Sequence, residues 1–600
     1  MNVKDEEKTT GSLHGADGVG AEKVFVDNAS TVSNERFATT SAQHRTLESY
    51  HVNLIAIGGT IGTAIFVYIG AGLTAGGPLM LLLAYIYWAS VIFMIAELQK
   101  EMVCLWPTDV AFARNASRYI DDAAGFAAGY NFWISQVALA IFEIVAFGVV
   151  IGFWESTRRI SAAVFISILI VAYIALNIWN TRFFGNAEFG FAIGKVLLIT
   201  GLLLFTFIAM LGGNPLHDRF GFRYWKNPGR SNLRRDRPEE VGMITTPYPD
   251  HPTGVGKFEG YLACLTNAAF TMAGPDYLSM VAGEARNPRR TMHRAFNSTI
   301  YRLIIFFIGT VLAVGVLCPY NDSGLISAQK ASAPGGARSP YVIAMNRMMI
   351  PVLPHIVNGL ILTSVFSAGN AYIFTSSRGL AQMARDGQAP KLFARRNRNG
   401  VPSIAVGFCM LLCLLSYCQV STSAQVVIKY LTNLVASSQL VNWILLAFTW
   451  IRFNAAHKAQ GISRDSLPVR SHFLPFGTSL IKDLVKRPLE FTTDQLVFWV
   501  CVGAWYAFIS SIFVLLMQGY YVFLSGAWDI SAFLFAYMMP ILFIALYLGW
   551  KILKRTRFYR ASEVDILSFK YDAEFTEHIE YDQERSKVGL LVHRALSTMF

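Results

Sequence analysis

Two clusters of glycine or proline interrupt apolar segments where continuous helices are expected. Residues 58–63 read GGTIGT inside the first long apolar segment, and residues 273–276 read AGPD inside the sixth. Such clusters break the hydrogen-bond ladder of a helix and leave amides and carbonyls without helical partners. In a lipid environment this backbone is tolerated only where it is buried in protein or lines a cavity. The two clusters therefore predict a binding site built from the backbone of two broken helices.

The residues around the first cluster carry groups that hold a carboxylate. The amides of Gly62, Thr63 and Ala64 are predicted to open the second half of the first broken helix. A helix N-terminus carries partial positive charge and free N–H donors, so it binds anions well. Thr60 and Thr63 add hydroxyl donors to the same predicted site.

Backbone carbonyls supply the complementary groups for a cation. The first half of the broken helix is predicted to end near Ile57, and further free carbonyls are expected near Phe270 and Met272. The last carbonyls of a helix have no partner within it, so they can accept from an ammonium group. Amides for an anion and carbonyls for a cation together fit a zwitterion, which predicts an amino acid-like substrate.

Ionisable residues inside apolar segments are costly and are candidates for function. Lys195 lies several residues inside the fifth segment, where a lysine can gain and lose a proton during a transport cycle. The alternative is a lysine whose stem lies along apolar surface while its head group reaches water.

Two acidic residues can each have either a functional or a structural role. Glu143, deep in the third segment, can accept a proton or pair with a cation, or it can be a protonated carboxyl hydrogen-bonded within the packing. Asp276 follows the second cluster and can face a substrate amine or cap the next half-helix.

Membrane helices must position these residues. Hydrophobic residues make up 54 % of the 600-residue chain and charged residues only 15 %, whereas soluble proteins carry about a quarter charged residues. A spanning helix needs about 20 mostly apolar residues, so the apolar runs predict an all-α membrane protein. About twelve spans are expected, near residues 52–73, 79–99, 124–150, 160–180, 190–212, 260–283, 298–318, 352–376, 402–419, 427–452, 496–518 and 530–553.

The two interrupted helices, spans 1 and 6, stand five spans apart. Either cluster alone could be a packing glycine or a kink, but matched breaks in two halves are typical of inverted-repeat transporters with a site at the midplane. The predicted organisation is a disordered tail, a transmembrane domain and a second tail. These cover residues 1–47, 48–555 and 556–600, with repeats at about 52–212 and 260–452 and spans 11–12 at about 496–553.

Basic residues in the short connecting segments predict the orientation. The segments after spans 2, 6, 8 and 12 are rich in Lys and Arg and fall on the same side as both termini. This predicts cytoplasmic termini. The basic segment at residues 213–257 disagrees, because this orientation places it outside.

Other classes of function are disfavoured. The net charge of +12 comes from short segments between apolar spans, which indicates membrane topology rather than nucleic-acid binding. The seven cysteines have no His-rich partner segment, so no metal site is expected. No phosphate-binding loop, metalloprotease or hydrolase motif is present, so we expect neither an enzyme nor a cofactor. The N-terminal 47 residues lack the apolar core of a signal peptide.

Several longer motifs resemble the fungal amino acid permeases, the yeast amino acid transporter group of the amino acid–polyamine–organocation superfamily. The strongest is IAIGGTIGTAIFVYIGAGLTAGGP at residues 55–78, which is similar to that family's first span. Others are SRYIDDAAGFAAGYNFW, AGEARNPRR and SRGLAQMARDGQAPKLFARRNRNGVP, at residues 117–133, 282–290 and 377–402. The resemblance implies a twelve-span plasma-membrane permease of the LeuT-like five-plus-five fold that couples uptake to protons.

The resemblance also implies roles for residues. It assigns Lys195 to the span 5 lysine that replaces a sodium ion in proton-driven members, and Glu143 to a recurrent span 3 acid. The implied substrate site comprises Gly59, Thr60, Ile61, Gly62, Thr63, Ala64, Phe270, Ala273, Gly274 and Asp276.

Four positions depart from the family pattern. Ala64 stands where a third glycine is usual, Pro275 where threonine is common, Asp276 where the family usually has glutamate, and Lys100 where glycine usually precedes Glu101. The resulting prediction is a symporter that moves an amino acid with protons through a multi-pass domain by alternating access. The alternatives are uptake of a polyamine or carnitine-like amine, and a sensor of amino acids that transports little.

Overall fold

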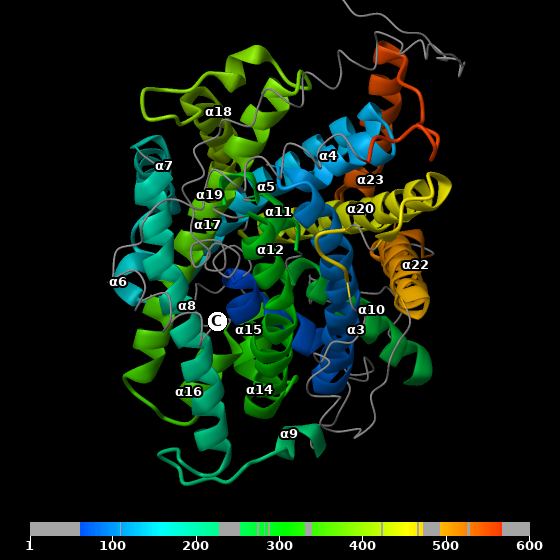
Figure 1. Cartoon of the computed structure of the whole chain (residues 1–600). Coiled ribbons are helices and arrows are strands. Elements are labelled where there is room, and N and C mark those ends of the chain that lie inside the picture. The colour runs from blue at the N-terminus through cyan, green and yellow to red at the C-terminus, as the bar shows by residue number, and fades with distance from the viewer. Residues whose placement is uncertain are drawn as a thin grey trace, which may run out of the picture. The chain divides into compact units, whose positions relative to one another are not determined.

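Helices of different lengths, joined by turns and irregular segments, make up the described part of the chain (Figure 1). The computed structural model describes residues 61–108, 110–179, 181–226, 253–272, 275–280, 282–285, 288–330, 339–421, 424–464, 467–471, 493–524 and 528–566. These ranges contain helices and turns and no strand. All of them belong to one compact unit, residues 44–600.

The long helices follow the predicted spans closely. Nine helices within the described ranges are long and apolar enough to cross a membrane, and Ala162–Ile178 is a shorter apolar helix. This confirms the prediction of an all-α membrane protein. The nine cover residues 64–105, 122–151, 187–210, 288–317, 353–385, 403–420, 426–459, 498–517 and 530–554. The longest single helices are α3 (Ile69–Leu105), α5 (Asp122–Ile151), α7 (Ala162–Trp179), α8 (Thr181–Met210), α10 (Thr253–Thr271), α17 (Leu353–Arg385), α20 (Ala424–Ala459), α22 (Thr493–Met517) and α23 (Ile530–Lys554).

Shorter elements complete these spans and connect them. The seventh span is built from α13 (Thr299–Arg302), η4 (Leu303–Ile308) and α14 (Gly309–Leu317), and the ninth from α18 (Ser403–Cys413), η7 (Leu414–Tyr417) and α19 (Cys418–Ser421). The others are η1 (Ala64–Tyr68), α4 (Ala111–Tyr119), α6 (Glu155–Arg158), α9 (Arg223–Lys226), α11 (Asp276–Met280), η3 (Ala282–Glu284), α12 (Pro288–Asn297), α15 (Ser323–Lys330), α16 (Pro340–Arg347), η6 (Lys391–Ala394) and η9 (Tyr520–Phe523).

Gly77 separates the first and second predicted spans, although α3 runs through both. Its φ of 79° and ψ of 174° are non-helical, and Pro78 follows. This backbone region is open essentially only to glycine, and Pro78 begins the next helical segment because its fixed φ suits a first turn.

Replacement of Gly77 by alanine should therefore destabilise the fold. A Cβ at this φ costs about 1–3 kcal/mol, so we expect a lower apparent melting temperature for the purified protein. The matched control is Gly201→Ala in α8, where a Cβ meets no atom within 4 Å. Equal melting temperatures for Gly77→Ala and the unmodified chain would contradict this assignment of strain.

Close packing brings the two broken spans together. The segment before Gly77 packs along α10, and α5 packs along α17. A Cβ on Gly76 would lie 2.8 Å from the carbonyl oxygen of Gly260, and one on Gly260 would lie 3.1 Å from that of Ala75. Glycine at both positions lets the two backbones approach, which is how helices associate closely in membranes.

Candidate functional site

A helix begins at the position of the first predicted break. Ile61 and Gly62 are not helical, Thr63 is the N-cap, and η1 begins at Ala64. The helix therefore opens with the amides predicted from the sequence. Gly59 and Thr60 lie outside the described residues.

The carboxylate of Glu143 occupies this helix N-terminus. Glu143 projects from α5 and is 1 % exposed. Its Oε1 accepts from the Thr63 amide at 3.2 Å, and its Oε2 accepts from the Thr63 hydroxyl. A Cβ on Gly62 would lie only 2.5 Å from Glu143 Oε1, so glycine is what allows the carboxylate to approach. An internal carboxylate thus holds the place that the sequence predicts for a substrate carboxylate.

The second predicted break is present. Helix α10 ends at Thr271, Met272 lies in a bend, and α11 begins at Asp276. Asp276 is 2 % exposed and lies close to the indole of Trp443. Ala273 and Gly274 lie outside the described residues.

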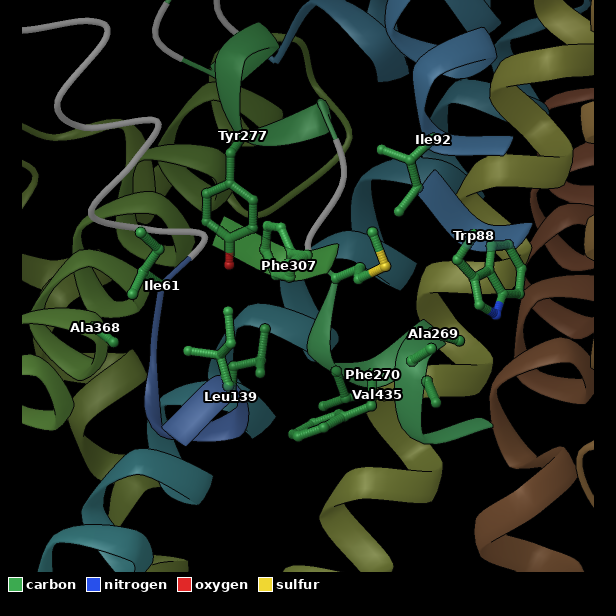
Figure 2. Packing of buried hydrophobic residues seen from close by; sticks show 14 of the residues in the cluster. Ile61, Trp88, Ile92, Leu139, Ala269, Phe270, Tyr277, Phe307, Ala368 and Val435 are labelled. Atoms are coloured by element: carbon green, nitrogen blue, oxygen red, sulfur yellow. The ribbon is translucent and has the colours of Figure 1, made fainter. Parts of the chain in front are cut away.

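An aromatic layer and a buried apolar cluster adjoin the two breaks. The Phe270 ring stands edge-on to Tyr68 and to Phe142, with centroids 5.2 and 5.0 Å apart. Figure 2 shows Ile61 and Phe270 in one cluster of buried hydrophobic residues together with Leu139, Ala368 and others. Two predicted site residues that are distant in sequence, Ile61 and Phe270, therefore belong to one core.

Lys195 is fully enclosed and has an acidic neighbour that the sequence reasoning missed. Its Nζ lies 3.9 Å from Oε1 of Glu188, and both side chains are at most 1 % exposed. Glu188 stands two turns earlier on α8, and its Oε1 also accepts from the Ser367 hydroxyl of α17 at 2.8 Å. The burial of Lys195 argues against a head group that reaches water.

The lysine connects both acids electrostatically. Lys195 interacts with Glu188 and with Glu143, and the buried phenols of Tyr173 and Tyr372 interact with both carboxylates. These groups come from α5, α7, α8 and α17. A proton gained or lost at any of them changes the field at the first break, because charges interact strongly in a region that excludes water.

Tyr277 is a further polar group that the sequence reasoning missed. Its hydroxyl donates to Gln136 Oε1 at 2.7 Å, and the Thr375 hydroxyl donates to the same oxygen at 3.0 Å. Figure 2 shows the Tyr277 hydroxyl directed toward the buried residues around Ile61 and Leu139. The short helix after the second break is thereby tied to α5 and α17.

Comparison with known proteins adds independent information. A sequence model of the amino acid permease family matches residues 51–482. The chain is 39 % identical to the general amino acid permease AGP2 of Saccharomyces cerevisiae over 547 residues, which are 90 % of this chain and 84 % of that protein. It is 35 % identical to a proline-specific permease of Emericella nidulans, with 91 % of each chain covered.

Some solved structures are also similar to this chain, with lower sequence identity. A nucleobase-cation-symport-1 transporter, MHP1, is 14 % identical, with a TM-score of 0.43 and coverage of 82 % of this chain and 96 % of that chain. A manganese transporter of Eremococcus coleocola is 13 % identical, with a TM-score of 0.45 and coverage of 84 % and 94 %.

Proposed function

Because the chain belongs to the amino acid permease family, we propose that it takes up amino acids across the plasma membrane by proton symport and alternating access. The observation that carries this proposal is the Glu143 carboxylate at the Thr63 amide. In the proposed orientation both termini are cytoplasmic, residues 48–555 form the transport domain, and residues 1–47 and 556–600 are tails.

The substrate carboxylate replaces Glu143 at the helix N-terminus in this proposal. The Thr63 amide and hydroxyl both donate to Glu143, and two carboxylates cannot share these donors without strong repulsion. Entry of the substrate therefore favours a protonated Glu143 that has moved away from Thr63. Substrate binding and proton binding then become one linked event.

Lys195 and Glu188 supply the second half of the coupling. When Glu143 is protonated, Lys195 loses one of its two negative neighbours, so its own proton is held less firmly. Glu188 remains hydrogen-bonded to Ser367 of α17. The charge state of the cluster is thus linked to the position of α8 against α17.

The same geometry supports a second candidate, uptake of a polyamine or carnitine-like cation. Glu143 already occupies the amides, and a substrate without a free carboxylate need not displace it. A cation could instead bind beside Glu143. An amino acid substrate requires Glu143 to leave the Thr63 donors, whereas a cationic substrate requires Glu143 to stay charged.

Glu143→Gln separates the two candidates. For an amino acid, loss of the internal charge should remove most of the pH dependence of binding and keep or improve affinity at neutral pH. For a polyamine, the same change should weaken binding by at least about tenfold, because a charge-assisted contact is lost. The measurement is binding of radiolabelled amino acids and polyamines to purified protein between pH 5 and 8.

Uptake by vesicles tests transport itself. We expect amino acids to accumulate against their gradient when the outside is acidic, and a proton ionophore to abolish the accumulation. A protein that binds amino acids without accumulating them under these conditions would be a sensor and not a symporter.

A further inference from the structure

A cavity lies on the Gly77 side of the first break, away from Gly62. Its free volume is about 50 Å³. One wall comes from the start of α3 and another from α10, so both broken spans face it. Helix α20, the end of α22 and η9 complete the lining, which includes Tyr68, Glu259, Asn267, Lys429 and Gln518.

Lys429 gives this cavity a half-buried ammonium group that no carboxylate contacts directly among the described residues. Its side chain is half-buried, and among the described residues it makes no hydrogen bond or ion pair. Its attraction to Asp529 acts at longer range. Removing a charge from water without a partner is costly, so a carboxylate in the cavity would satisfy Lys429.

Two acceptors face the same space. Glu259 of α10 is 5 % exposed and lines the cavity. Gln518 is also 5 % exposed; its Nε2 donates to the Asn433 carbonyl at 2.8 Å, while its buried Oε1 has no partner among the described residues. A carboxylate and a free amide oxygen are suitable acceptors for an ammonium group.

Aromatic side chains lie between this cavity and the Glu143 site. Tyr68 lines the cavity and contacts Phe270 on its other side, and Phe270 contacts Phe142 of α5. Asn267 of α10 donates to the Tyr68 carbonyl at 3.0 Å and accepts from Tyr85, which ties the backbone at Tyr68 to α10. The cavity and the helix N-terminus are therefore distinct sites with one aromatic layer between them.

We propose that this cavity is a second site for the zwitterionic head group of a small amino acid, from which the substrate passes the Tyr68–Phe270 layer. Lys429 binds the carboxylate, and Glu259 with Gln518 Oε1 accepts from the ammonium. The inference rests on the proposed transport function, which supplies the substrate class. In the proposed orientation the cavity faces outward.

Binding by the full-length Gly62→Leu chain tests the site, because this change blocks the helix N-terminus. L-alanine at millimolar concentration should raise the apparent melting temperature by a few degrees, as expected for a ligand of the folded state. Isopropylammonium, which lacks the carboxylate, and propionate, which lacks the amine, should not. Lys429→Gln on this background should remove the shift.

Arg223→Gln on the same background is the matched control, since it removes one positive charge from an exposed side chain of α9 that does not line the cavity. It should leave the shift unchanged. No shift with L-alanine, a shift that survives Lys429→Gln, or an equal shift with isopropylammonium alone would each overturn the proposal. Uptake by the unmodified chain tests the transport function separately.

A kinetic measurement serves if Gly62→Leu does not yield monodisperse protein. Lys429→Gln alone should then raise the half-saturating alanine concentration for uptake about tenfold, as expected for one lost charge-assisted contact. Arg223→Gln should not change it. An unchanged half-saturating concentration in Lys429→Gln would overturn the proposal.

Discussion

Lys195→Met is expected to abolish proton-driven accumulation of amino acids while leaving substrate binding in place. Lys195 lies 3.9 Å from Glu188, and it is the one cation that interacts with both buried acids among the described residues. Methionine fills similar volume but carries no proton. Exchange of external for internal amino acid, which needs no net proton movement, should persist. The measurement compares accumulation under an imposed pH gradient with exchange in the same vesicles.

Lys195→Met also leaves Glu188 without its cation, and the effect of this on folding needs a separate control. Removing one partner of a buried ion pair costs about 3–5 kcal/mol, so Lys195→Met alone can lose activity by misfolding. The double variant Lys195→Met, Glu188→Gln removes both members of this ion pair, while Glu143 keeps its hydrogen bonds from Thr63. It should fold while still failing to accumulate substrate.

A second buried pair provides a matched comparison. Lys100 lies 2.6 Å from Glu97 at the other end of α3, and their side chains are 4 % and 7 % exposed. Lys100→Met, Glu97→Gln removes an equivalent pair far along the chain from the two breaks and should keep proton-driven accumulation. Full accumulation by Lys195→Met, Glu188→Gln at low external pH would exclude a proton role for this lysine.

The sequence was sufficient to predict the apolar helices and the helix ends next to the two glycine or proline clusters. Apolar runs and glycine or proline clusters are local signals, and the helices begin or end at Thr63, Thr271 and Asp276 as these signals indicate. Local sequence signals predict some span ends less well. The apolar helix at Ala162–Ile178 is shorter than the predicted span, and α3 continues through Gly77, where two separate spans were expected. There the ends depend on how neighbouring helices pack.

The partners within the site could not be predicted in the same way. Glu143 and Thr63 are 80 positions apart, and their hydrogen bonds depend on the register of α5 against the first broken span. Glu188 falls just before the predicted start of span 5 at residue 190, so it lies outside every predicted span. Helix α8 begins earlier, at Thr181, and buries it. An acid seven residues before a buried lysine, on the same helical face, was the available signal.

Gly62→Leu should block binding of the amino acid at the helix N-terminus. The structure gives the physical reason: a Cβ at this position would lie 2.5 Å from Glu143 Oε1 and 3.4 Å from the Ala368 Cβ. A leucine side chain therefore covers the Thr63 amide or forces the half-helix away from α5. We expect the dissociation constant of the high-affinity site, measured with a radiolabelled amino acid, to rise by at least about a hundredfold. This rise corresponds to about 2.8 kcal/mol.

Gly201→Leu in α8 is the matched control, because a Cβ there meets no atom within 4 Å and the position faces outward. It should bind with unchanged affinity. Unchanged affinity in Gly62→Leu would mean that the substrate carboxylate does not use these amides, and the Glu143 contact would then be structural. Loss of binding in Gly62→Leu, together with pH-independent binding in Glu143→Gln, requires that substrate and Glu143 use the same donors. That result would make the first break both the substrate site and the point where the proton enters the cycle.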